Sequence, residues 1–406
     1  MVSCLALLDA PAEEVLQWLR QIGAPPAAPD PMHVLVDLPG VRIKWERHGE
    51  FAGLTLVRPL PGATPRGLDA FPSAFGALSA LGLEHLPGRL IAAADIAVLP
   101  GGVGQIDEDE VARWFDPNAL AGSRVLDGSA ALFTDFILRD EGGRGARTRW
   151  MVLDAGMDVA QSARLVHRVI EIETYRMMAL LAFPLARAAI PQLNEIEQQL
   201  SWITAATAAL RGQADLVATQ AEERRLLDEL TRVAAEVERS VAATTFRFSA
   251  AQAYWELVRA RVGELREQRI GKRRTIGGFL SRRMAPAMQS CAAAARRQEE
   301  VSARIERGSS LLRTRVDVAR EEQNQRLLEA MDRRGRISLR LQQTVEGLSV
   351  AAITYYGAGL TAYLVKPLKS FWPGLNTDWV VAAAIPVLAW LIWRGVRRFR
   401  RSVEAD

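Results

Sequence analysis

Two uncharged apolar segments near the end of the chain constrain its fold more than any other feature. Leu348–Val365 contains eighteen residues without a charge, and Trp379–Trp393 follows after a thirteen-residue loop. As helices they would rise roughly 27 Å and roughly 22 Å, close to the hydrocarbon thickness of a bilayer. A pair of buried core helices is the alternative, but aromatic residues bracket the segments and arginines follow the second, as at a membrane interface. The sequence therefore predicts a two-helix transmembrane hairpin over residues 348–393.

Basic residues around the hairpin predict its orientation. The loop Lys366–Asp378 carries two lysines, whereas arginines are more numerous on both outer flanks. Because cytoplasmic flanks carry an excess of Lys and Arg, both termini are expected in the cytoplasm, at the cell inner membrane. The apolar run at the start of the chain is too short for a signal peptide and has no basic region before it. The expected membrane-interface residues are Trp379, Trp393, Arg394, Arg397, Arg398, Arg400 and Arg401.

The distribution of charge argues against nucleic-acid binding. The formal net charge is +4, and the basic cytoplasmic tail predicted at 394–406 holds five arginines against two acidic residues, a net +3. The other 393 residues therefore carry a net +1. Nucleic-acid binding needs basic residues concentrated on one surface, so no nucleic-acid partner is expected. The expected partners are the lipid bilayer and a protein.

Motifs for catalysis or cofactor binding do not occur in the sequence. Two cysteines, Cys4 and Cys291, cannot form a disulfide framework or a cysteine-rich zinc site. The chain has no P-loop, no GxGxxG after a strand, no HExxH and no GxSxG. The glycine cluster at Gly101–Gly104 lacks phosphate-binding spacing and is interpreted as a loop. The sequence therefore predicts no enzyme, no cofactor and no metal.

Residues 1–157 are typical of a cytosolic α+β domain. Amphipathic helices are expected at Ala12–Ile22 and Asp107–Phe115. The expected strands are Val2–Leu8, Val34–Leu38, Val41–Glu50, Leu54–Val57, Ala131–Leu138 and Thr148–Leu153. This order favours a helix-covered antiparallel sheet, for which a ferredoxin-like topology is one solution.

From Asp158 the apolar period becomes helical, which predicts a helical stalk domain over 158–347. Spacings of three and four are typical of long helices packed along coiled-coil-like seams. The expected seam residues are Leu193, Ile196, Leu200, Ile203, Leu210, Leu226, Leu230, Val233, Val237, Tyr254, Val258 and Leu265. A turn is predicted at the glycines Gly271, Gly277 and Gly278.

The last helix is expected to run without a proline from about Ser302 into the first apolar segment, with bends at Gly335 or Gly347. Gln323 falls in the register of the apolar residues, where a polar side chain can set the register of an oligomer or lie in an exposed turn. The helical domain is therefore a candidate for self-association or for binding a protein partner.

Small residues in the first apolar segment recur at a spacing of four, which permits close packing of helices. These helix-packing candidates are Gly357 with Thr361 and Ala358 with Ala362. Tyr355 and Tyr356 place hydroxyls near the middle of the bilayer, and lining a pore is the alternative to packing within the hairpin. Neither segment holds an acidic, basic or histidine side chain, which argues against proton-coupled transport.

Polar residues on one expected strand form a first candidate binding site. Side chains alternate along Arg42–Phe51, so Glu46, His48 and Glu50 share one face. The opposite face is expected to hold Val41, Ile43, Trp45 and Phe51. A Glu–His–Glu row can bind a cation or a charged partner, or form the solvated face of an antiparallel strand.

His167 and Glu171 form a second polar candidate on an expected helix. Their i, i+4 spacing can place two metal ligands on one face. No third ligand is identifiable from the spacing, and salt bridges with neighbouring arginines explain the pair equally well.

Three stretches resemble a known family. They are RIKWERHGEF at Arg42–Phe51, RLVHRVIEIETYRMMALLAFPLAR at Arg164–Arg187, and Leu311–Leu360, which opens LLRTRVDVAREEQNQRLLEAMDRR and closes LQQTVEGLSVAAITYYGAGL. Together they resemble the mostly proteobacterial, membrane-anchored proteins of domain-of-unknown-function family thirty-four twenty-two, over nearly the whole chain. The resemblance implies a C-terminal membrane anchor and no known activity.

Two departures from the family pattern stand out. Members usually begin with an extra segment that contains a His-Ala-Arg-Pro element, which this chain lacks, so either the start site is misassigned or that function is lost. Gly49, Ala52 and Gly53 replace bulkier polar or aromatic residues that are common in the family.

The sequence as a whole favours a membrane-anchored interaction or scaffold protein. The alternative is an oligomeric ion channel or transporter subunit, because a cytosolic head, a stalk helix and a C-terminal hairpin resemble the layout of CorA-type magnesium channels. That family closes its first membrane helix with Gly-Met-Asn, whereas Gly374-Leu375-Asn376 lies well beyond the end of the first apolar segment here.

Overall fold

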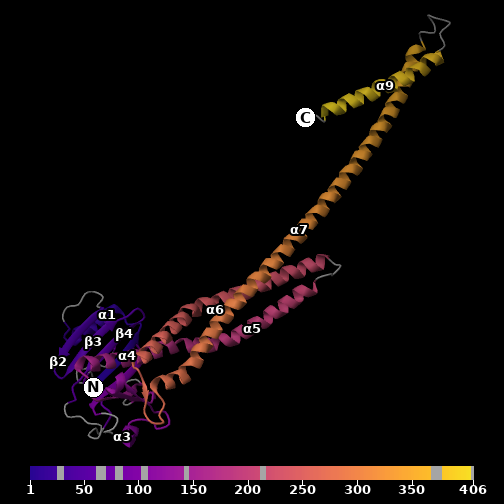
Figure 1. Ribbon diagram of the computed structural model, residues 1–406. Coiled ribbons are helices and arrows are strands. Elements are labelled where there is room, and N and C mark those ends of the chain that lie inside the picture. The colour runs from indigo at the N-terminus through magenta and orange to yellow at the C-terminus, as the bar shows by residue number, and fades with distance from the viewer. Residues whose placement is uncertain are drawn as a thin grey trace. The chain divides into compact units, whose positions relative to one another are not determined.

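The computed structural model describes residues 1–24, 32–60, 70–77, 86–101, 108–140, 146–210, 216–366 and 377–403 (Figure 1). Two compact units divide the chain, Met1–Leu311 and Leu312–Asp406. The first unit contains a β-sheet and most of the long helices. The second contains the C-terminal part of one long helix and the final helix. Each unit is described by itself.

Within the described residues, the strands of the first unit form one nine-stranded sheet. Its order is β2 (His33–Leu38), β3 (Val41–Arg47), β4 (Phe51–Val57), β1 (Val2–Leu8), β5 (Arg89–Pro100), β8 (Thr148–Asp154), β7 (Ala130–Thr134), β6 (Ala121–Val125) and β9 (Gln268–Arg269). Neighbouring strands are antiparallel except for the parallel pair of β5 and β8. The α+β class is therefore confirmed, in a sheet that is larger than expected and contains one parallel pair.

The expected strands differ from the observed ones where local chemistry is ambiguous. Strand β5 was not expected because its sequence RLIAAADIAVLP is rich in alanine, which is a poor strand former. The strand expected at Ala131–Leu138 ends at Thr134, because Phe136 adopts a positive φ of 56°. The strand expected at Val41–Glu50 ends at Arg47, where a turn leads into β4. That turn also reverses the face of Phe51: it packs with Ala6, Leu8 and Met178, not with Trp45 as expected.

Helix α1 (Ala12–Gln21) covers one face of the sheet. Its buried residues Val15, Trp18 and Leu19 share a core with strand residues that include Ile43 and Trp45. The indole rings of Trp18 and Trp45 lie 6.5 Å apart, centroid to centroid. The aromatic residues that complete this core are Phe71, Phe75, Trp114 and Phe115, the last two just after α3 (Glu108–Ala112).

Helix α4 (Val159–Leu180) covers the opposite face. The Asp158 side chain accepts a hydrogen bond from the Gln161 backbone and the Gln161 side chain accepts one from the Asp158 backbone, so the helix starts with a capping box. Its buried residues pack on strand residues such as Ile96 and Trp150. Because β1 lies between two covered faces, all seven of its residues are buried.

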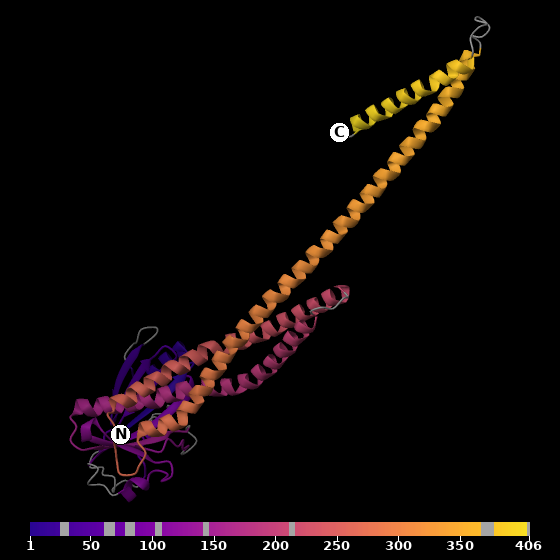
Figure 2. The ribbon, with the colours of Figure 1, turned by 45° about the vertical axis from the view of Figure 1, so that its right-hand side comes forward.

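The long helices α5 (Ala182–Ala209), α6 (Leu216–Glu264) and the beginning of α7 (Ile276–Val365) pack together in the first unit (Figure 2). Of the expected seam residues, Leu210 and Tyr254 are half-buried and the other ten are buried. The long helices of the expected stalk are confirmed, although α7 begins earlier than expected and contains Pro286.

The connection between α6 and α7 returns to the sheet and forms β9. The Glu267 carboxylate accepts hydrogen bonds from the backbone N–H of Ile276 at 2.8 Å and of Gly277 at 2.9 Å. A carboxylate at this position also stabilises the helix dipole of α7. A Cβ at Gly277 would lie 2.7 Å from Val262 Cγ1, so this close approach requires glycine.

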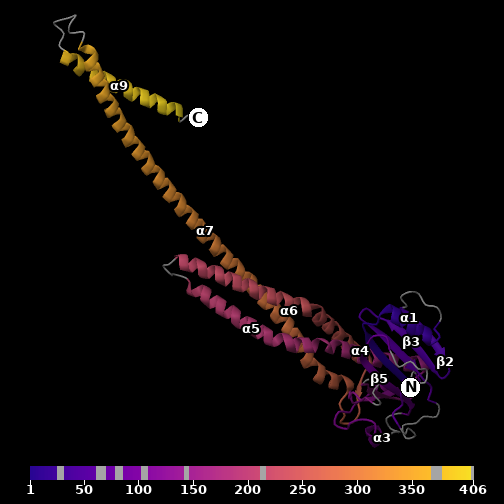
Figure 3. The same cartoon turned by 180° about the vertical axis from the view of Figure 1, so that it is seen from behind.

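The second unit contains α7 from Leu312 to Val365 and α9 (Thr377–Val403). Figure 3 shows α9 crossing the C-terminal end of α7. Half-buried residues mark the facing sides of the two helices: Thr354, Gly357, Ala358, Thr361, Ala362 and Val365 on α7, and Val380, Val381, Ala384, Leu388, Ala389 and Ile392 on α9. Each helix is long and apolar enough to cross a membrane, and none of either apolar window is buried.

Candidate functional site

Two of the stretches that are far apart in the sequence meet in space. The end of β3 and the turn after it carry Glu46 and His48, and these residues lie next to His167 and Glu171 of α4. The charges of Glu46, His167 and Glu171 all act on the His48 imidazole. Glu46, His167 and Glu171 also line one cavity of about 960 Å³ between the β3–β4 face of the sheet, α4 and the end of α6.

Glu171 is the centre of an ion-pair network in this cavity. Its Oε2 lies 2.7 Å from Arg261 Nε of α6, and its Oε1 lies 4.0 Å from His167 Nε2. The Tyr175 hydroxyl donates a hydrogen bond of 3.4 Å to Oε1. Arg261 also pairs with Glu264, at 2.5 Å. Salt bridges therefore account for the i, i+4 pair in this structure.

Glu50 lies on the other side of the same junction and contacts α6. The Arg247 guanidinium donates to its carboxylate, and the Tyr254 hydroxyl forms a second hydrogen bond with it. Burial and the Glu50 charge raise the pKa of Tyr254 to about 12. The row expected on one strand face is thus split, with Glu46 and His48 facing α4 and Glu50 facing α6.

Aromatic rings join these two parts of the junction. His48 stacks on Phe51 with ring centroids 4.4 Å apart, and Tyr175 lies 6.3 Å from Phe51 and 5.7 Å from Tyr254. Burial among these rings is the main cause that lowers the pKa of His48, so its imidazole is neutral at neutral pH. His167, by contrast, has a side chain that is 56% exposed.

The carboxylates of the junction are paired with basic side chains of the same chain. In the described part of the chain, no group of three or more His, Cys, Asp or Glu side chains has an arrangement that holds a metal ion. The carboxylates of Glu46, Glu50 and Glu171 each face a basic side chain, from Lys44, Arg247 and Arg261 respectively.

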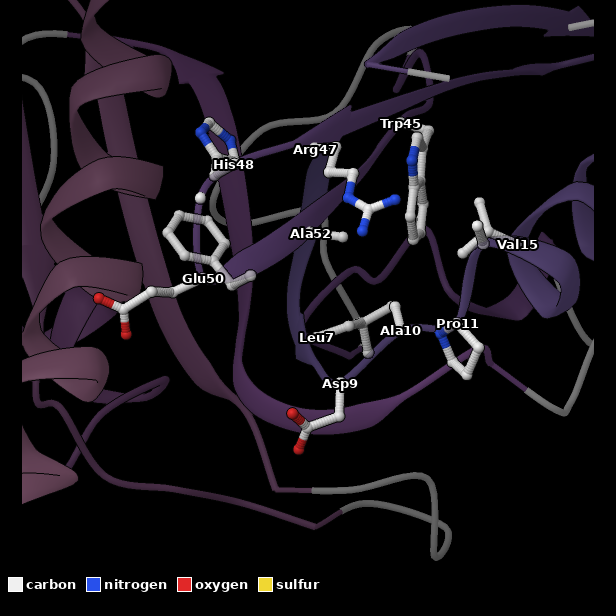
Figure 4. Close-up of a pocket in the computed structure, with 13 residues that line it drawn as sticks. Leu7, Asp9, Ala10, Pro11, Val15, Trp45, Arg47, His48, Glu50 and Ala52 are labelled. Carbon is white, nitrogen blue, oxygen red and sulfur yellow. The ribbon is translucent and has the colours of Figure 1, made fainter. Parts of the chain in front are cut away.

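A second, smaller cavity of about 340 Å³ lies on the other face of the β3–β4 hairpin. Figure 4 shows the Arg47 guanidinium next to the Trp45 ring, with the carboxylates of Asp9 and Glu50 turned away from it. Trp45 Nε1 is buried and has no hydrogen-bond partner among the described residues. The N-terminus of α1 at Pro11 also borders the cavity and has no side-chain cap. This cavity offers hydrogen-bond donors.

The structure places the expected helix-packing residues on the side of α7 that faces α9. A Cβ at Gly357 would lie 3.4 Å from Leu388 Cδ1. The Thr361 hydroxyl donates a 2.8 Å hydrogen bond to the Gly357 carbonyl, which satisfies it within the helix. Ala358 and Ala362 are half-buried on the same side.

The expected membrane-interface residues lie on α9. Trp379 near its start is 76% exposed and Trp393 is 49% exposed. The guanidinium carbon of Arg397 lies 4.9 Å from the centre of the Trp393 ring, and that of Arg394 lies 5.1 Å from the centre of the Trp390 ring. Arg398 follows on the same helix. Arg400 and Arg401 belong to α9, but their side chains lie outside the described part, as do residues 367–376 of the expected loop.

Comparison with known families identifies the class of protein. A family model described as protein of unknown function (DUF3422) matches residues 5–403. The chain therefore belongs to this family, which confirms the resemblance carried by the three stretches. No curated protein and no solved structure matches the chain.

Several residues of the junction were not expected from the sequence. Tyr175 lies four residues after Glu171, a spacing that places both on one helix face. Arg247, Tyr254 and Arg261 come from α6, and only the fold brings that helix to the β3–β4 hairpin. Tyr254 was expected as an apolar seam residue, and nothing in its local sequence indicates a bond to Glu50.

Proposed function

We propose that this protein is a membrane-anchored interaction protein. A cytoplasmic α+β head with its long helices is held at the inner membrane by the α7–α9 hairpin. One observation carries this proposal: no residue of either apolar window is fully buried, and the sides of α7 and α9 that face away from each other expose apolar side chains, which a bilayer would remove from water.

The composition of the hairpin supports membrane insertion. Most residues on the facing sides of the two helices are small or β-branched, and Gly357 faces Leu388; small residues at the interface are how helices associate in lipid. Tryptophans lie at both ends of the second span, and arginines follow it, as at the cytoplasmic interface. This arrangement supports an anchor whose two termini are cytoplasmic.

Fractionation tests the anchor. The full-length chain should remain in the membrane pellet after a carbonate wash, and a variant that ends at Gly347 should be found in the supernatant. A phosphatase reporter inserted in the loop Lys366–Asp378 should be active outside the cytoplasm, and one fused after Asp406 should not. Full-length chain in the supernatant would refute the anchor, and an inactive loop reporter would refute its orientation.

The cavity where β3 meets α4 is the proposed interaction site. Arg164 lines it and is exposed, whereas Arg187 is exposed on α5 outside it. After purification in mild detergent with cross-linking, a bound protein should be lost from Arg164→Glu and retained by Arg187→Glu. A partner retained by both variants, or lost from both, would place the interaction elsewhere.

A channel subunit is the second candidate function. Tyr355 and Tyr356 are 76% and 71% exposed on sides of α7 that do not face α9. In a symmetric ring of several chains, these tyrosines would line the central pore. Ion flux into liposomes that contain the purified chain, abolished by substitution of these tyrosines, would support a channel, and sealed liposomes would exclude it.

A further inference from the structure

The part of α7 before the first span has no partner within its own unit. Every residue from Glu321 to Val345 is exposed, although this segment contains many apolar residues. The large exposed ones are Leu327, Leu328, Met331, Ile337, Leu339, Leu341 and Val345. A solitary helix in water gains no tertiary stabilisation, and an exposed apolar stripe of this length marks an interaction surface.

These residues follow a heptad repeat. One set of residues on α7 alternates at spacings of four and three, and we call this set the seam. It consists of Leu327, Met331, Arg334, Ser338, Leu341, Val345 and Leu348. Met331, Ser338 and Val345 then occupy a positions, and the other four occupy d positions. Leucine fills three of the four d positions, as it does in two-stranded parallel coiled coils.

The charged residues avoid the seam. Eight charged residues lie between Asn324 and Leu348, and seven of them occupy the outward b, c and f positions. The exception is Arg334, at d. The e and g positions beside the seam hold uncharged residues, among them Leu328, Ala330 and Ile337. Two identical seams can therefore face each other with one like-charge contact.

We propose that this seam binds the same seam of a second copy of the chain, in a parallel coiled coil next to the membrane. The inference rests on the proposed function, because a shared membrane anchor holds two copies in the same orientation. A lipid surface is the rival occupant, but residues 312–365 form one unbroken helix within a single unit. A helix that enters the bilayer at Leu348 cannot also lie flat on it without a break.

A residue inside the span extends the same seam. Tyr355 lies seven residues after Leu348 and is 76% exposed. Its ring centroid lies 5.8 Å from that of Tyr356, and among the described residues its hydroxyl has no hydrogen-bond partner. In the apolar region of a bilayer an unpaired hydroxyl is unfavourable, and a second copy supplies a partner.

Cysteine cross-linking distinguishes the seam from the rest of the helix. Leu341 and Leu339 are both exposed leucines, at 62% and 56%, two residues apart, but only Leu341 lies on the seam. In the full-length chain in native membranes, oxidised Leu341→Cys should give at least tenfold more disulfide-linked dimer than Leu339→Cys. The unsubstituted chain, whose two cysteines are buried, is the blank.

Equal cross-linking of the two variants, or no dimer from either, would overturn the proposal. Protection of Leu341→Cys from a water-soluble thiol reagent without a dimer would assign the seam to lipid instead. Carbonate washing of the same membranes tests the membrane anchor independently of the coiled coil. Chain that stays in the membrane but does not cross-link refutes the coiled coil alone, and chain that is released refutes the anchor.

The arginine in the seam provides a second test. In a parallel pair, Arg334 of one copy faces Arg334 of the other, which opposes association. Arg334→Leu should increase the dimer formed by Leu341→Cys severalfold, whereas Arg333→Leu, at an outward position, should not. An equal effect of both substitutions would indicate nonspecific hydrophobic association and contradict the seam.

Discussion

Gly357 sets how closely α7 and α9 approach, and enlarging it tests the packing of the hairpin. The matched control is Gly359, two residues later, where an added Cβ would meet nothing within 4 Å. Replacing each glycine by leucine adds the same apolar volume to the same helix. Only Gly357→Leu places that volume against α9.

The expected cost follows from the distance to Leu388. A Cβ at Gly357 would lie 3.4 Å from Leu388 Cδ1, which is a van der Waals contact, so Gly357→Ala should be tolerated. Leucine adds three further carbons in space that Leu388 occupies, and such overpacking costs roughly 1–3 kcal/mol. At about 2 kcal/mol the equilibrium between paired and separated helices shifts roughly 30-fold, because about 1.4 kcal/mol is a factor of ten.

A disulfide between the helices reports this equilibrium. Thr361 and Ala384 lie one turn from Gly357 and Leu388 towards the loop, on the facing half-buried sides. A Thr361→Cys, Ala384→Cys pair should oxidise readily in mild detergent, and adding Gly357→Leu should slow the reaction at least tenfold. Gly359→Leu should leave the rate unchanged. Equal rates in the two glycine variants would refute the packing described for this hairpin.

Three further predictions concern the first unit. Burial lowers the pKa of His48 from its ordinary value of 6.5, so the unfolded chain binds more protons than the folded chain near and below that pH. The free energy of unfolding should therefore fall as the pH is lowered below about 6.5. Measured by chemical denaturation, this fall should be shallower for His48→Gln than for the unsubstituted chain. An equal fall in both would exclude His48 as the cause of the pH dependence. Burial and the Glu50 charge raise the pKa of Tyr254 to about 12, so ultraviolet titration of Tyr254→Phe should lack the highest-pH step. An unchanged curve would contradict the raised pKa of Tyr254. Gly277→Ala should destabilise the unit by roughly 1–3 kcal/mol. Gly263 lies on an open helix surface, so Gly263→Ala should stabilise the unit by roughly 0.5–1 kcal/mol. A thermal unfolding midpoint that shifted in the same direction for both variants would contradict the close approach at Gly277.

Periodic patterns in the sequence predicted the helical part of the fold well. Ile196, Leu230 and Val258 were expected on seams and are buried, because each long helix must bury one apolar stripe. Strand β5 escaped detection because Ala92, Ala93 and Ala94 have no strand preference of their own. Its position between β1 and β8 determines its conformation, and that is information about tertiary structure.

The sequence allowed individual residues of the candidate site to be chosen, but it did not predict that they lie close together. Glu46, His48, His167 and Glu171 were chosen from local spacing, and the structure places them together across more than a hundred residues of sequence. The ion-pair partner of Glu171 is Arg261 of α6, and nothing in the local sequence indicates this pair. The turn after Arg47 likewise moves Phe51 to the face of His48, because three residues between strands break a period of two.

Strand β9 determines the order of events when the chain is synthesised. The edge of the sheet is completed by Gln268 and Arg269, and the helix after it starts at Ile276. The sheet therefore cannot finish folding on the ribosome until about 270 residues have emerged. Leu348, where the first apolar segment begins, lies 72 residues after Ile276. If the proposed anchor inserts during synthesis, the sheet can therefore be completed before the first apolar segment is made.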